Sequence, residues 1–240
     1  PNGVDTRYFY PASPDPAARL SKDRLTLFTL LRDDPQAGTV LAAKVLQRVK
    51  TTIPGIRIIT VGNLSSHPPF DTLVEEAIPS ASRREMRDIY RRSDIFVDFS
   101  MVQGFGLMGL EAMASGVAAV LSATGGAEEY ASSACAVLVP PGSEDGFVDA
   151  IMDLASNPRK IADLKTEGLR TAAAFDWRKR IDGHADFFES LLSKNNEITS
   201  EHREHMLRYL FGRLLRGLMT RSSVTEAQNH LNHALESSCP

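Results

Sequence analysis

Cysteine and tryptophan are scarce in this chain, and long apolar runs are missing. The 240 residues include two cysteines and one tryptophan, and aromatic residues make up 7%. Cys135 and Cys239 lie far apart in the sequence and cannot build a disulfide framework or a zinc site by themselves. No apolar run approaches the roughly 20 residues that span a bilayer. We therefore expect a cytoplasmic protein in a reducing environment.

An excess of charge of either sign is also missing. Lys and Arg number 27 against 30 Asp and Glu, which gives a net charge of −3. Hydrophobic residues make up 42% and charged residues 24%, an ordinary globular composition that excludes wholesale disorder, collagen and coiled coil. The balance does not favour a nucleic-acid partner.

Short apolar segments rich in strand formers alternate with segments of helical spacing. The strand candidates are residues 25–31, 56–61, 73–78, 95–99, 117–121 and 136–139. The helix candidates are residues 38–50, 82–92, 104–115, 127–132, 147–155 and 158–174. This alternation is typical of βαβ units and predicts an α/β fold, a Rossmann-like, doubly wound parallel sheet of about six strands.

In open parallel sheets, ligands bind beyond the carboxyl ends of the strands. Three loops at such ends stand out by composition, namely 32–38, 100–106 and 123–129. In the second loop, Gly104-Phe105-Gly106 follows a strand and leads directly into a helix that contains Glu111. Free amides at a helix N-terminus, together with the helix dipole, favour phosphate. From the residues alone, a plain tight turn followed by a solvated glutamate is an equally good interpretation.

The segment from Gln103 to Gly116 reads Gln-Gly-Phe-Gly-Leu-Met-Gly-Leu-Glu-Ala-Met-Ala-Ser-Gly. It resembles the signature of the family 4 retaining glycosyltransferases of the GT-B fold. In that family the signature lies in the C-terminal domain, which binds the nucleotide sugar. Further similar segments occur in the same order over residues 1–192. They are Asn2-Gly3-Val4-Asp5, Gly125-Gly126 with Glu128 and Glu129, Val137 to Gly142, and Phe175-Asp176-Trp177.

The resemblance implies a role for nine residues. Glu111 would bind the ribose of the donor, and the amides from Gly104 to Leu107 its diphosphate. Gln103 would contact the donor sugar, and Arg32 would neutralise the charge of the leaving diphosphate. Such neutralisation by an arginine can take the place of a metal ion. The catalytic candidates are thus Gln103 and Arg32, and the donor-binding candidates are Gly104, Phe105, Gly106, Leu107, Glu111, Gly125 and Gly126. Neither a cofactor nor a metal is expected.

Two positions depart from the family pattern. Gln103 stands where the family usually has Glu, and Ala37 where it usually has Lys. Losing one cation beside the diphosphate could cost on the order of 10²–10³ in rate. The alternative to an active glycosyltransferase is therefore a degenerate domain that serves as an interaction or scaffold module. A related sugar-nucleotide epimerase is a third hypothesis, but no acid or base for it stands out.

The two ends of the chain differ from its body. Pro1-Asn2-Gly3 is turn chemistry, so we expect a part excised from a longer enzyme, inactive without an N-terminal acceptor-binding domain. We expect the donor-binding domain to cover residues 1–194 and a helical tail or linker to cover 195–240. Residues 203–221 carry five arginines against one glutamate and a stripe of leucines. This segment either contacts a membrane surface, placing the protein at the cytoplasmic face, or packs on the parent protein.

Overall fold

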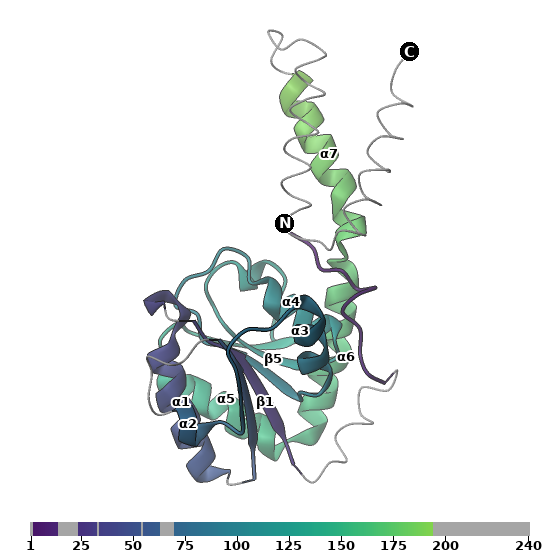
Figure 1. Ribbon diagram of the computed structural model, residues 1–240. Helices are drawn as coiled ribbons and strands as arrows, with labels where there is room; N and C mark the ends of the chain where they lie inside the picture. The colour runs from purple at the N-terminus through teal and green to yellow at the C-terminus, as the bar shows by residue number, and fades with distance from the viewer. Residues whose placement is uncertain (1, 14–23, 33, 54, 63–69, 194–240) are drawn as a thin grey trace. The chain divides into compact units, whose positions relative to one another are not determined.

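The computed structural model describes residues 2–13, 24–32, 34–53, 55–62 and 70–193 (Figure 1). The chain divides into two compact units, Pro1–Trp177 and Arg178–Pro240. The predicted tail over 195–240, with its basic segment 203–221, lies outside the described residues, and the boundary at 194 stays a prediction. No helix in the described part of the chain is long and apolar enough to cross a membrane.

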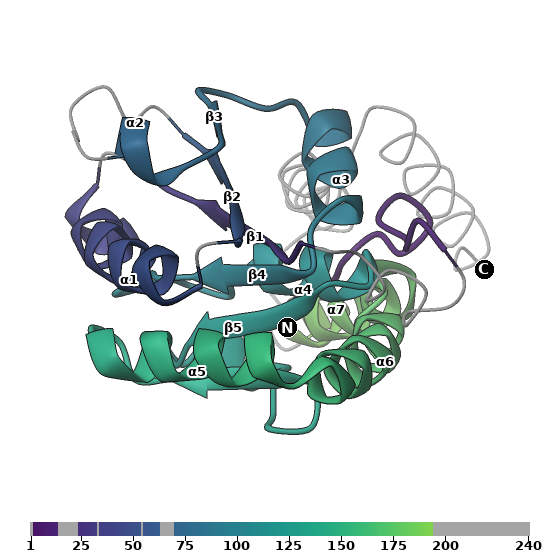
Figure 2. The same ribbon diagram turned by 90° about the horizontal axis from the view of Figure 1, so that it is seen from below.

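The first unit is built on one parallel sheet of six strands, as the sequence predicts. The strands run in the order β3-β2-β1-β4-β5-β6, so the order reverses between β1 and β4 (Figure 2). Their bounds are β1 (Thr26–Leu30), β2 (Arg57–Val61), β3 (Glu76–Ile78), β4 (Ile95–Asp98), β5 (Ala118–Ser122) and β6 (Ala136–Val139). A ligand site is expected at the carboxyl ends of β1 and β4, where the order reverses.

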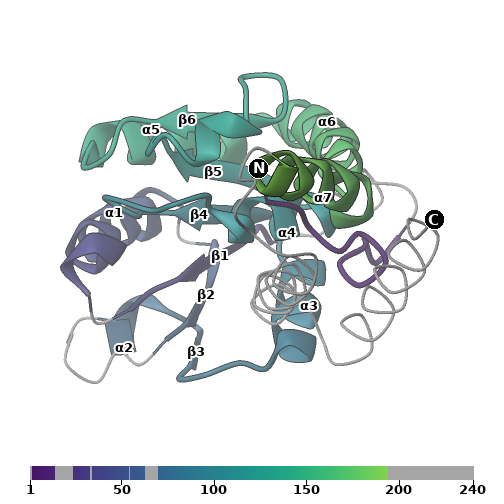
Figure 3. The same ribbon diagram turned by 90° about the horizontal axis from the view of Figure 1, so that it is seen from above.

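Helices cover both faces of this sheet. In the first unit they are α1 (Thr39–Thr52), α2 (Phe70–Leu73), α3 (Arg83–Arg91), α4 (Leu107–Ala114), α5 (Glu144–Ser156) and α6 (Pro158–Ala174), with short 3-10 turns η2 (Pro35–Ala37) and η3 (Ala127–Glu129). Helices α1 and α5 pack together on one face, whereas α3 and α4 lie on the other, with α6 against α4 (Figures 2 and 3). Helix α7 (Trp177–Ser193) follows.

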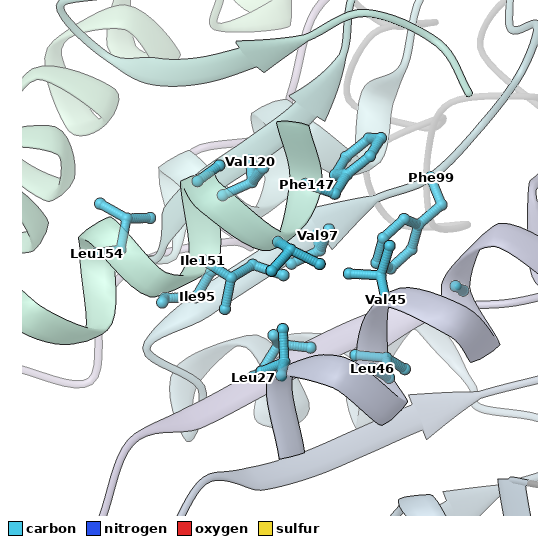
Figure 4. Packing of buried hydrophobic residues seen from close by; sticks show 14 of the residues in the cluster. Leu27, Val45, Leu46, Ile95, Val97, Phe99, Val120, Phe147, Ile151 and Leu154 are labelled. Atoms are coloured by element: carbon cyan, nitrogen blue, oxygen red, sulfur yellow. The ribbon is translucent and has the colours of Figure 1, made fainter. Parts of the chain in front are cut away.

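Successive side chains of the central strands point alternately into two separate hydrophobic cores. Leu27 of β1 and Ile95 of β4 belong to the core beneath α1 and α5, which Figure 4 shows. Their neighbours Phe28 and Phe96 belong to the core on the other face. Nearly all residues of β1 and β4 are buried, which is typical of strands covered on both faces of the sheet. Both central strands are therefore anchored in the interior from both sides.

The structure differs from the sequence expectation in four places. Leu73 ends the short helix α2, so the third strand comprises only Glu76–Ile78. Residues 104–106 precede α4 instead of opening it, because Gly106 has a φ of 79°, outside the helical region. The predicted helix 127–132 is the single turn η3, and α7 is a helix that the sequence analysis missed.

The opening segment of the chain is tied to the end of α6. The amide of Val4 donates to the carbonyl of Phe175 at 2.9 Å, and the amide of Trp177 donates to the carbonyl of Val4 at 3.0 Å. Both segments carry part of the family resemblance, although about 170 residues separate them. The structure thus brings the first and last matching segments of the first unit together.

Candidate functional site

Three loops meet at the carboxyl edge of the sheet, and they are the three that the sequence predicts. The amide of Met101, after β4, donates to the carbonyl of Gln36, after β1, at 2.7 Å. A Cβ added to Gly126, after β5, would lie 1.9 Å from the carbonyl oxygen of Gly104. Only a residue without a side chain allows this approach, so the glycine loops after β4 and β5 form one continuous surface.

Two backbone amides at the start of α4 donate to no acceptor among the described residues. Gly106 is the N-cap of α4, and its carbonyl accepts a hydrogen bond from the amide of Gly109 at 3.0 Å. The amides of Leu107 and Met108 come earlier and have no partner within the helix. The hydroxyl of Tyr130 donates to the same carbonyl at 2.8 Å and so stabilises the turn. This arrangement can bind an anion such as a phosphate.

The side chain of Glu111 lies one turn into α4 and is not a solvated helix residue. The hydroxyl of the buried Tyr90 donates to its Oε2 at 3.3 Å. Burial raises the pKa of Glu111 to about 7, although the nearby Arg83 guanidinium and the Tyr90 hydrogen bond each lower it. A carboxyl held partly out of water, beside unused amides, is a strong acceptor for hydroxyl groups once it is ionised.

Gln103 is the next residue of this surface, and it is anchored by a residue that the sequence analysis missed. Its Nε2 donates to Oδ2 of Asp98 at 2.5 Å. The amide and the hydroxyl of Ser100 donate to Oδ1 of Asp98 at 3.0 and 2.6 Å. Asp98 is only 5% exposed at the end of β4. The signal in the sequence was a charged residue inside the apolar run Ile95–Phe99, where an unpaired charge would be costly.

The remaining candidates lie in the loop after β1. Arg32 is exposed, and its carbonyl accepts from the Thr39 hydroxyl at 2.6 Å. Ala37 stands where the family usually has lysine, so this position carries no charge. Its side chain is buried, with 4% exposed. The structure thus places Arg32, Gln103 and the glycines at one sheet edge, while their roles stay predictions. Across the described ranges, no group of three or more His, Cys, Asp or Glu side chains is arranged to hold a metal ion.

Comparisons with known proteins agree with this fold. A family model described as "Glycosyl transferases group 1" matches residues 24–157, more than half of the chain. The D-inositol 3-phosphate glycosyltransferase of Mycolicibacterium smegmatis is 27% identical over 220 residues, which is 84% of this chain and 47% of that protein. A GDP-mannose-dependent alpha-(1-6)-phosphatidylinositol monomannoside mannosyltransferase from the same organism is 28% identical, over 75% of this chain and 53% of that protein. The chain therefore spans about half the length of these relatives.

Solved structures show the same architecture. The C-terminal domain of a glycosyl transferase group 1 family protein (LpcC) from Francisella tularensis matches with a TM-score of 0.60 and 24% identity, over 72% of this chain and 97% of that domain. The Anabaena protein HepE in complex with UDP-glucose matches with a TM-score of 0.65 and 19% identity, over 78% of this chain and 56% of HepE. At this level of identity the likeness concerns the fold alone.

Proposed function

Because the chain belongs to the glycosyl transferases group 1 family, we propose that it is the donor-binding half of a glycosyltransferase that uses a nucleotide diphosphate sugar and retains the anomeric configuration. The observation that supports this most directly is that α4 begins at the carboxyl edge of the sheet with the Gly106 N-cap and carries the half-buried Glu111 one turn further on. A nucleotide diphosphate sugar offers both complementary groups, a diphosphate anion and ribose hydroxyls.

Each group of the donor has a candidate partner in this surface. The amides of Leu107 and Met108, with the glycine loops of Gly104–Gly106 and Gly125–Gly126, bind the diphosphate. Glu111 accepts hydrogen bonds from the ribose hydroxyls, and Gln103 contacts the sugar. Arg32 stands at the end of β1 to neutralise the leaving diphosphate, so that no metal is required. The scaffold alternative is less favoured, because it gives no reason for an anion site beside a carboxylate.

In this proposal, an N-terminal domain binds the acceptor and forms the other wall of the catalytic site. Several relatives carry names with phosphorylated inositol or phosphatidylinositol acceptors. A lipid-linked acceptor is consistent with the predicted basic segment 203–221 at a membrane surface, on the cytoplasmic side. Nucleic acid is not a partner in this proposal.

Calorimetric titration of the 240-residue chain tests donor binding. UDP-glucose, GDP-mannose and ADP-glucose are the probes, and we expect one of them to bind. Glu111→Gln should weaken that binding about tenfold or more, because the ribose loses a charged acceptor. Glu167→Gln on α6, which removes a surface ion pair with Arg170, is the matched control and should leave binding unchanged. Failure of all three donors to bind would contradict the proposal and favour the scaffold alternative.

Binding should also depend on pH, because the pKa of Glu111 is raised to about 7. The ionised form is the better acceptor for ribose hydroxyls, so affinity for the nucleotide sugar should fall by up to tenfold per unit below about pH 7. Binding at pH 6 should then release a proton, which calorimetry detects as a dependence of the enthalpy on the buffer.

Two variants separate Glu111 from other titrating groups. Glu111→Gln cannot titrate and should give a flat pH profile. Tyr90→Phe removes a hydrogen bond that lowers the pKa of Glu111, so its midpoint should move to higher pH. A profile that is unchanged in both variants would show that Glu111 does not control binding.

A further inference from the structure

The side-chain amide of Gln103 has only one orientation compatible with its neighbour. Oδ1 of Asp98 already accepts from both the amide and the hydroxyl of Ser100. Oδ2 faces the Gln103 amide at 2.5 Å, and a carboxylate oxygen only accepts. Gln103 must therefore turn its NH₂ group toward Asp98 and its carbonyl oxygen, Oε1, the other way. No described residue donates a hydrogen bond to that oxygen.

We propose that Asp98 is a positioning residue that makes Gln103 present a hydrogen-bond acceptor to the sugar of the donor. This inference rests on the proposed function, since it assumes that a nucleotide sugar binds beside the loop. Sugar hydroxyls donate to acceptors, so Oε1 of Gln103 offers a neutral substitute for the carboxylate that family members usually have there. The departure at position 103 is thus matched by the buried acid at position 98.

The same pair explains why position 103 is an amide in this chain. A glutamate there would bring a second carboxylate to 2.5 Å from Oδ2 of Asp98, and both could not stay ionised. Gly106 also lies close to this amide, since a Cβ added there would be 2.9 Å from Nε2 of Gln103. The Gln103 side chain is therefore near both Asp98 of β4 and the glycine turn.

Exchanging the two groups tests this inference. In Asp98→Asn, the asparagine oxygen keeps the Ser100 hydrogen bonds and its NH₂ faces Gln103. The Gln103 amide then turns over and shows a donor to the sugar. We expect about tenfold weaker binding of the nucleotide sugar and a change below threefold for the matching nucleoside diphosphate. Gln103→Glu alone should have a similar effect, because repulsion from Asp98 displaces the side chain from its position in the loop.

The double variant Asp98→Asn, Gln103→Glu is the decisive control. The introduced asparagine then donates to the introduced glutamate, whose other oxygen faces the sugar as an acceptor, so nucleotide-sugar affinity should return to within about threefold of the unmodified chain. Equal losses for the nucleotide sugar and the nucleoside diphosphate, or no rescue in a double variant that unfolds at the normal temperature, would overturn the inference and reduce the pair to a loop contact. Absence of nucleotide-sugar binding by the unmodified chain would instead overturn the proposed function.

Discussion

Replacing Arg32 with alanine should weaken binding of the nucleoside diphosphate by about 10- to 100-fold. The residue is exposed at the carboxyl end of β1, where the strand order reverses. Hydrogen bonds to a charged partner contribute roughly 1.5–3 kcal/mol, and Ala37 supplies no second charge in this loop. In the complete enzyme, the same substitution should lower the transfer rate by about 10²–10³, because the diphosphate gains charge as the sugar leaves.

The nature of the bound ligand distinguishes this effect from a loss of loop structure. Titration with the nucleoside diphosphate, the nucleotide sugar and the uncharged nucleoside measures it, and the loss should be largest for the diphosphate and absent for the nucleoside. Arg32→Lys should recover part of the affinity, since lysine keeps the charge without the two-pronged geometry. The matched control is Arg170→Ala, on the surface of α6. An equal loss for all three ligands would show that Arg32 does not contact the diphosphate.

Features of the fold that depend on local pattern could be predicted from the sequence. The central strands are mostly apolar, and the helices between them have a 3.6-residue period, so a parallel sheet covered on both faces follows. The N-terminus of α3 could also be predicted, because Ser82 and Glu85 have the spacing of a capping box, and both of its hydrogen bonds are present in the structure. Because parallel strands end at the same edge, the meeting of the three loops followed as well.

Features that depend on distant contacts could not be predicted. Burial raises the pKa of Glu111, and this pKa is lowered by Arg83 and by the hydrogen bond from Tyr90, which reaches Glu111 across 21 residues of sequence. Asp98 and Gln103 are close in sequence, but the contact between their side chains and the close approach of Gln103 to Gly106 appear only in the folded loop. A pattern of residue types identifies the candidate loop, whereas the protonation and orientation of its side chains arise from packing.

Breaking a buried ion pair outside the predicted site should lower the free energy of unfolding more than any other substitution proposed here. Asp94 is 4% exposed just before β4, and Lys165 of α6 is 1% exposed. Their Oδ1 and Nζ atoms lie 3.4 Å apart, and Oδ2 of Asp94 accepts from the amide of Thr26 at 2.9 Å. Asp94→Ala leaves the lysine charge in the core without this carboxylate. We expect the free energy of unfolding in urea to fall by about 3–5 kcal/mol.

Comparison with an apolar replacement and with a surface pair separates the charge effect from simple truncation. The double variant Asp94→Leu, Lys165→Met removes both charges and should recover most of the lost stability, because the buried lysine charge is removed together with its carboxylate. Asp153→Ala breaks the exposed pair with Lys160 on neighbouring helices and should cost less than about 1 kcal/mol. Since Asp94 stands at the amino end of β4 and the loops at its carboxyl end, donor affinity in folded Asp94→Ala should stay unchanged. A stability loss no greater than that of Asp153→Ala would show that this pair does not hold α6 to the sheet.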